Sequence, residues 1–246
     1  MERELEKRVG APYFMVTFTL PEEPRALFFT PSQRAMYEML FAAAASALAA
    51  TLANPRWLGA QKSGFTIILH TWNQRLLFHP HLHCIVPGAG LDAAGRIVSV
   101  ASPGFLVPQP VLRAAFREEF RRRLDQLAPD HPMPVIDPAV WHKDWGVHLQ
   151  SFGDGKHVIK YLGAYVCRTA IGDSRILKVS NTHVTFSWKD RAHGDAPRTE
   201  TLTGTEFCAC YLRHVLPSGL RAICRYGFCH PAARDTRERK CGPSCA

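Results

Sequence analysis

The sequence predicts an α+β fold with a mostly antiparallel central sheet and flanking helices. Short runs of β-branched and aromatic residues, the pattern typical of strands, recur along the chain. Two longer segments, rich in alanine or arginine, have the composition of helices. The two kinds of segment alternate irregularly, and several strand-like runs are separated by only a few turn residues. That spacing indicates hairpins rather than the long crossovers of a parallel sheet.

Seven strands are expected in order along the chain. Each is an apolar or aromatic run bounded by Gly, Pro, Asn or Ser. The turn at residues 73–75 should join the second strand to the third, and residues 181–182 should join the fifth to the sixth. The expected strands are residues 13–20, 65–72, 81–86, 147–152, 175–180, 183–189 and 220–228.

Four helices are expected between these strands. In the first, Thr30 should be the N-cap, Pro31 should occupy the first turn and Gln33 should complete a capping box. Residues 203–206 (TGTE) are a second capping box at the start of the last helix. The second helix is amphipathic and rich in arginine. The expected helices are residues 31–53, 110–127, 156–171 and 204–215.

Composition and charge exclude several classes of protein. A chain of 246 residues, 46% of them hydrophobic and 21% charged, has the balance of a globular protein. No uncharged apolar run reaches the roughly 18–20 residues of a membrane span, and the charged N-terminus lacks the apolar core of a secretory signal. The net charge of +9 favours a polyanionic partner, of which nucleic acid is the usual one.

The sharpest local pattern is a histidine-rich strand at residues 78–84 (FHPHLHC). Because side chains alternate on a strand, His81 and His83 should project from one face, with Cα atoms about 6.8 Å apart. Two neutral imidazoles could then bind one metal ion. A His-x-His pattern also arises by chance in a chain with 12 histidines. His79 could extend the row, support a ligand or contact a phosphate.

The second pattern is a pair of tyrosines, Tyr161 and Tyr165, on the expected third helix. Four residues apart, they should lie on one helix face, flanked by Lys160 and Arg168, which could hold a phosphate. A phenol becomes a useful nucleophile when a metal polarises the target phosphate. Taken alone, the two tyrosines would be expected only to fill the boundary between the core and the solvent. Together with the histidines and the basic charge, it predicts a metal-assisted tyrosine nuclease.

These motifs resemble those of the HUH endonucleases (His–hydrophobic–His), and among them the two-tyrosine rolling-circle transposases of bacterial insertion sequences. The resemblance depends on residues 79–88 (HPHLHCIVPG), on residues 70–74 (HTWNQ) upstream, and on residues 161–168 (YLGAYVCR). It extends from about residue 12 to residue 228. Shorter similar segments are residues 18–20 (FTL), 202–207 (LTGTEF), 214–217 (HVLP) and 225–228 (RYGF).

The resemblance implies an HUH-nuclease-like fold and a divalent metal, Mg or Mn, that polarises a phosphate of single-stranded DNA at transposon ends and target. Tyr161 or Tyr165 would attack and become joined to the 5′-phosphate, leaving a free 3′-hydroxyl. The second tyrosine would serve a second strand transfer. No nucleotide cofactor is needed, because the phosphotyrosine bond conserves the energy. We expect a protein of the bacterial cytoplasm that associates with the nucleoid and has no membrane partner.

The resemblance also implies a third metal ligand beside His81 and His83. Gln74 is the first choice, because the turn that contains it should lie near the histidine strand, and His70 and His79 are alternatives. A carboxylate would suit Mg better than an amide, but no Asp or Glu is nearby in the sequence. The arginine-rich helix is either a DNA-binding surface or a solvated face. The expected DNA contacts are His79, Lys160, Arg168, Arg117 and Arg121.

The chain departs from the family at both ends. Members commonly begin with a cysteine-rich zinc module, whereas no cysteine precedes Cys84 here, so we expect a truncated copy or a fragment. We expect a basic tail at residues 1–11, the catalytic domain at 12–228 and a charged tail at 229–246, whose cysteines either bind zinc or are spare thiols. Three alternatives stay open: a replication initiator with the same chemistry, an inactive DNA-binding remnant, and a zinc phosphoesterase that leaves the tyrosines idle.

Overall fold

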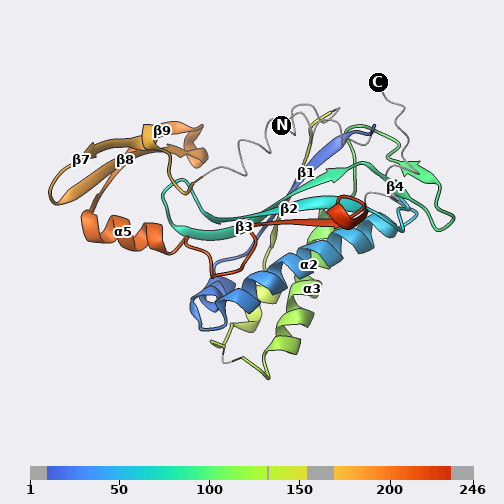
Figure 1. Cartoon of the computed structure of the whole chain (residues 1–246), viewed down its shortest axis with the longest axis horizontal. Helices are drawn as coiled ribbons and strands as arrows, with labels where there is room; N and C mark the ends of the chain where they lie inside the picture. Colours follow the sequence, from blue (N-terminus) through green and yellow to red (C-terminus); the bar gives the residue numbers. More distant parts are fainter. Residues whose placement is uncertain (1–9, 132, 154–168, 234–246) are drawn as a thin grey trace.

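A five-stranded antiparallel sheet forms the centre of the computed structural model, which describes residues 10–131, 133–153 and 169–233 (Figure 1). The strand order is β10-β2-β3-β1-β6, and every neighbouring pair is antiparallel. The predicted fold class is therefore confirmed. The strands are β1 (Tyr13–Thr19), β2 (Gly64–Trp72), β3 (Phe78–Pro87), β6 (Gly146–Ser151) and β10 (Ile223–Gly227).

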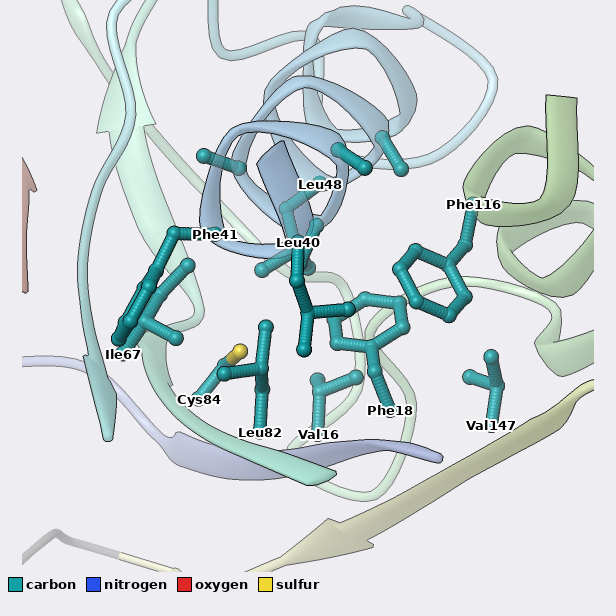
Figure 2. Packing of buried hydrophobic residues seen from close by; sticks show 14 of the residues in the cluster. Val16, Phe18, Leu40, Phe41, Leu48, Ile67, Leu82, Cys84, Phe116 and Val147 are labelled. Carbon is teal, nitrogen blue, oxygen red and sulfur yellow. The ribbon is translucent and has the colours of Figure 1, made fainter. Parts of the chain in front are cut away.

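Two long helices, α2 (Gln33–Ala53) and α3 (Gln109–Leu127), cover one face of this sheet (Figure 1). Figure 2 shows Leu40 and Leu48 of α2 and Phe116 of α3 above the apolar side chains of the strands. The rings of Phe18 and Phe116 meet at a centroid distance of 4.6 Å. The strand residues of this core that Figure 2 labels are Val16, Phe18, Ile67, Leu82, Cys84 and Val147.

Helix α2 is long and apolar enough, by length and composition, to cross a membrane, but 67% of its most apolar window is buried inside the molecule. This burial explains why α2 is apolar nearly all round, since a helix enclosed by a core needs no polar face. The start of α2 differs from the prediction. Its N-cap is Ser32, and the Thr30 hydroxyl instead donates to the Leu27 carbonyl (3.0 Å) at the end of the short helix η1 (Glu23–Phe29).

A second sheet of three antiparallel strands forms one end of the molecule in Figure 1, together with α5 (Gly204–Leu212). Its strands are β7 (Ile176–Val179), β8 (His183–Asp190) and β9 (Ala196–Thr203). The predicted hairpin of β7 and β8 is confirmed, whereas β9 was not predicted. The second capping box is present, because the Glu206 amide donates to the Thr203 hydroxyl (3.2 Å) and the Thr203 amide donates to the Glu206 carboxylate (2.9 Å).

The remaining elements are short and lie in the connections. Strands β4 (Ala89–Leu91) and β5 (Ile97–Ser99) form a hairpin after β3 that was not predicted. The predicted last helix is three residues shorter than expected, and the helix predicted at residues 156–171 falls mostly outside the described residues. The other 3-10 helices are η2 (Pro138–His142), η3 (Asp173–Arg175), η4 (Arg191–His193) and η5 (Pro231–Ala233).

Candidate functional site

The face of the central sheet that points away from α2 and α3 carries a group of three neighbouring histidines. Because Leu82 and Cys84 of β3 face the helices, their neighbours His81 and His83 project from the opposite face. The register of the sheet adds a third, since His70 on β2 lies directly opposite His81. None of the five strands of this sheet contains an Asp or a Glu. The face therefore combines imidazoles with no negative charge from the strands.

The three imidazoles are close enough to bind one metal ion. One ring nitrogen from each of His70, His81 and His83 lies within 4.8 Å of the others. The rings of His81 and His83 are nearly perpendicular, with centroids 4.8 Å apart, and the His70 ring lies 5.0 Å from that of His83. His70 and His83 are buried, with 5% and 9% of their surface exposed. The arrangement is a compact group of nitrogen donors supported by two paired strands.

The first choice for the third ligand, Gln74, lies in the turn between β2 and β3. The strand register shifts between His70 and Trp72, and Gln74 follows in the turn between β2 and β3. Its carbonyl accepts a hydrogen bond from the Arg175 guanidinium. His79, the other alternative, has its ring centroid 5.3 Å from that of His81, outside the group of three. The structure thus brings His70 beside His81 and His83, and Gln74 as a ligand stays a prediction.

Hydrogen bonds to the second ring nitrogens prepare two of these histidines as ligands. The His81 Nδ1 lies 2.7 Å from the His79 carbonyl, which can only accept, so this nitrogen carries the proton and Nε2 keeps its lone pair. The His83 Nδ1 lies 3.2 Å from the Thr17 hydroxyl on β1. An Nδ1–H that donates to this hydroxyl leaves Nε2 of His83 available. Such second partners hold a ligand ring in its orientation and tautomer.

Burial favours the neutral form of His81 and of its neighbour His79. Burial lowers the pKa of His81, the bond to the His79 carbonyl raises it, and the charge of Arg191 lowers it again. Burial lowers the pKa of His79 to about 4, helped by the charges of His81 and Arg25. A metal ligand must be the neutral imidazole, so the lowered pKa of His81 reduces competition from protons at this ligand.

The donor set indicates which ions would fit. Three imidazole nitrogens with no nearby strand carboxylate suit a first-row transition metal such as Mn, Ni, Cu or Zn better than Mg, which prefers oxygen ligands. Three protein ligands also leave coordination positions open for a substrate oxygen. The chemistry that this arrangement permits is polarisation of a bound phosphate or carbonyl.

The other predicted site residues do not join this group in the described part of the chain. Tyr161, Tyr165, Lys160 and Arg168 lie outside the described residues. Arg117 and Arg121 are on α3, which packs on the face of the sheet opposite the histidines. The Arg117 guanidinium lies 3.6 Å from the carboxylate of its neighbour Glu118, so part of its charge is offset.

Two arginines near the histidines were not predicted. Arg25, in η1, and Arg191, in η4, act electrostatically on His79 and His81. Arg25 donates to the Leu20 carbonyl (3.4 Å), and its Nε is buried without a hydrogen-bond partner among the described residues. Both belong to short connecting segments without periodic patterns, so no sequence signal marked them.

Thr17, which contacts His83, was not predicted either, but a sequence signal for it exists. Alternation along β1 places its side chain on the face opposite that of the core residues Val16 and Phe18.

Comparison with known proteins places this chain among transposases. The family model described as "Y2_Tnp: Putative transposase" matches residues 64–237, which contain all three histidines. The "Putative transposase y4qJ" of Sinorhizobium fredii (strain NBRC 101917 / NGR234) is 35% identical over 93% of this chain and 61% of that protein. The "Transposase for insertion sequence element IS801" of Pseudomonas savastanoi pv. phaseolicola is 27% identical over 88% of this chain and 54% of that protein.

Among solved structures, the conjugative relaxase TrwC in complex with OriT DNA has a TM-score of 0.35 and 12% identity, covering 92% of this chain and 70% of the relaxase chain. A likeness at this level does not establish a shared fold. The chain spans 54–61% of the length of the two curated relatives. The family model, in contrast, covers more than half of the chain, and so the chain belongs to the Y2_Tnp transposase family.

Proposed function

We propose that this chain is the catalytic region of a DNA transposase that nicks and rejoins single-stranded DNA through a 5′-phosphotyrosine intermediate, during rolling-circle transposition of an insertion sequence. The observation that carries the proposal is the group of three histidines on a sheet face, in a chain that belongs to a transposase family. The net charge of +9 supports a DNA substrate. The place of action would be the bacterial cytoplasm, at the nucleoid.

The histidines would hold one divalent ion against the scissile phosphate, and of Mn and Mg their nitrogen donors favour Mn. His81 and His83 would bind through Nε2, because their Nδ1 atoms face the His79 carbonyl and the Thr17 hydroxyl. His70 replaces Gln74 as our choice for the third ligand. Bound there, the ion would polarise the phosphate and offset the charge that develops on its oxygens. The strands supply no carboxylate that would repel the DNA.

The covalent step would be performed by Tyr161 or Tyr165. The phenol gives its proton to water, and its oxygen attacks the phosphorus while the bond from phosphorus to the 3′-oxygen breaks. That oxygen leaves with the bonding pair and is protonated to a free 3′-hydroxyl. The 5′-phosphate is then joined to the tyrosine, and attack by another 3′-hydroxyl reverses the step on a new strand. Lys160 and Arg168 would contact neighbouring phosphates.

Family membership favours this function over a replication initiator with the same chemistry. One alternative keeps a specific observation in its favour. Three histidine ligands with an open position also suit zinc-dependent hydrolysis with no covalent step. The two readings differ in whether protein and DNA become joined, and an inactive DNA-binding remnant would show binding without either product.

The test is a labelled single-stranded DNA from the flanks of the coding region, incubated with Mn²⁺ or Mg²⁺ and run on a denaturing protein gel. The label lies 3′ of the nick, so that the joined fragment is detected. We expect a metal-dependent shifted band that is lost in Tyr161→Phe/Tyr165→Phe and in His81→Ala. Tyr211→Phe on α5 and His142→Ala in η2, both exposed and away from the histidines, should keep the band.

Two results would contradict the proposal in different ways. Metal-dependent cleavage without a shifted band, unchanged in the double tyrosine variant, would indicate hydrolysis without a covalent step. Salt-sensitive DNA binding with no cleavage in any metal would indicate a binding protein that lacks the chemistry.

A further inference from the structure

The three-stranded sheet of β7, β8 and β9 has two unlike faces. On the inner face, buried Phe186 packs with Ile176, Leu202 and the α5 residue Phe207 against Leu76 from the turn between β2 and β3. The outer face is formed by the alternate positions, which point away from this cluster. Among the residues that the structure describes, only the inner face packs into a core cluster, which leaves the outer face open to a partner.

The strand residues of the outer face carry positive charge and hydroxyl groups and no carboxylate, and Glu206 of α5 lies at its His183 end, bonded to the Thr203 hydroxyl (2.8 Å). The register places Lys178 opposite Thr185, and Thr185 opposite Thr201, whose hydroxyls lie 2.9 Å apart. Lys178 and Lys189 are exposed, and neither forms a salt bridge within the part of the chain that the structure describes. The side chains that define this basic face are Lys178, His183, Thr185, Lys189, Thr199 and Thr201.

The acidic residues of these strands lie on the other face and are already paired. Glu200, opposite Phe186, accepts two hydrogen bonds of 2.8 Å from Arg75. Asp190 contacts His193 at 2.9 Å and Arg198 at 3.7 Å. The charge of the basic face is therefore not offset by acids of its own strands.

The basic face is held in a defined position relative to the histidines. Arg75, which binds Glu200 and also lies over the Trp188 ring at 5.4 Å, belongs to the hairpin turn that follows His70. Arg175, in η3 just before β7, donates a hydrogen bond to the Gln74 carbonyl of the same turn. Two contacts therefore fix the sheet that carries Lys178 and Lys189 to the turn that follows His70. Along β8, Thr185, opposite Lys178, lies about 14 Å from Lys189 at ~3.4 Å per residue.

We propose that this basic face binds the sugar–phosphate backbone of the DNA whose scissile phosphate lies at the histidines. The inference rests on the proposed function and adds a second contact surface to it. Lysines and hydroxyl groups are the usual partners of phosphate and sugar oxygens, whereas the face has no Phe, Tyr or Trp on which a base could stack. The contact is therefore independent of sequence, and its length matches about four base-pair steps of ~3.4 Å.

The test is a fluorescence anisotropy titration in EDTA, so that binding is measured whether or not the protein cleaves DNA. The two probes are a labelled 30-nucleotide single strand of mixed sequence and a labelled hairpin of the same length. For Lys178→Gln/Lys189→Gln, we expect at least about fivefold weaker binding at 50 mM salt. The slope of log affinity against log salt should fall by roughly 1.4 on single strands or 1.8 on duplex.

The matched control is Lys62→Gln/Arg96→Gln, which removes the same charge beside the β4–β5 hairpin at the opposite end of the view in Figure 1. It should stay within about twofold of the wild type. A loss of affinity seen only with the hairpin probe would mean that the basic face binds duplex DNA. An equal loss of affinity with both probes would mean that it binds a single strand. Affinity and salt slope equal to those of the control would overturn the proposal. Absence of cleavage would contradict only the proposed function.

Discussion

The two faces of the central sheet are made by the same five strands, yet one is an apolar core and the other combines a polar histidine site with a small apolar cluster of Tyr13, Ile68 and Ile85. Toward α2 and α3, residues such as Val16 and Leu82 are fully buried among apolar side chains. On the other face, His81 and His83 are followed toward the sheet edge by Thr17 and the exposed His148. Because strand residues alternate, a register shift of one residue would exchange the two faces.

This difference between the faces explains how the fold supports its site. The helix-covered face supplies the stability, and the histidines are held rigidly because their immediate chain neighbours are locked into the core. Substitutions on the helix-covered face should therefore change the free energy of unfolding, and substitutions among the histidines and their partners on the other face should change metal affinity. Four experiments test this division, from the largest expected effect to the smallest.

The largest effect is expected for Phe18→Ala on the helix-covered face. Phe18 is 1% exposed, and its ring packs on Phe116, so truncation leaves a cavity that the surrounding helices fill only in part. The free energy of unfolding should fall by about 3–5 kcal/mol, measured by urea denaturation. Phe105→Ala, at a residue 48% exposed, is the control and should cost less than about 1 kcal/mol. Equal losses in the two variants would mean that the core is elsewhere.

On the histidine face, His70→Ala and Gln74→Ala should separate clearly in metal affinity. Calorimetric titration of Mn²⁺ into the metal-free protein should show more than about 100-fold weaker binding for His70→Ala, beyond the 10–100-fold typical of a supporting residue. Gln74→Ala should stay within about threefold, because Gln74 belongs to the turn beyond the register shift that follows His70. The reverse order of affinities would make Gln74 the third ligand.

A smaller change in metal affinity is expected for Thr17→Val, which removes the hydroxyl beside the His83 Nδ1. The ring loses the partner that orients it, so Mn²⁺ affinity should fall about 10–100-fold while the ligands themselves stay in place. Thr17→Ser keeps the hydroxyl and should restore most of the affinity. If Thr17→Ser is as weak as Thr17→Val, the methyl group rather than the hydrogen bond is what matters at this position.

The smallest effect is expected at the end of β2, where His214 contacts the Thr71 hydroxyl (3.2 Å) and donates to the Leu76 carbonyl (3.0 Å). Burial lowers the pKa of His214, with the Leu76 bond opposing and Arg213 adding to the shift. Below about pH 6.5, His214 is protonated in the unfolded chain but not in the folded protein. The free energy of unfolding therefore decreases as the pH falls toward the pKa of the folded state. This single group contributes at most about 1.4 kcal/mol per pH unit.

Urea denaturation of the wild type and of His214→Gln at pH 7.5, 6.5 and 5.5 measures this contribution. The variant should lose less stability than the wild type between the highest and the lowest pH, since all other titrating groups are common to both proteins. Identical pH dependence in the two proteins would show that His214 does not resist protonation.

Much of the fold could be predicted because local patterns were strong. The strand with His81 and His83 and the capping box at Thr203 and Glu206 were both recognisable from spacing alone. The N-cap at Thr30 was predicted wrongly, since η1 directly before it uses the same hydroxyl to end its own turn. Strand β9 was missed because its exposed residues are mostly polar, which weakens the apolar signal of a strand.

By itself, the sequence determined which histidines of β3 share a face, because the direction of a strand side chain depends only on its position along the chain. It also determined the family, through motifs distributed over most of the length. Only the tertiary structure decided that His70 lies beside His81, since that pairing depends on a register with a shift before Trp72. It likewise decided that Arg191 lies near the same ring, because packing, rather than any local pattern, brings segments about 100 residues apart together.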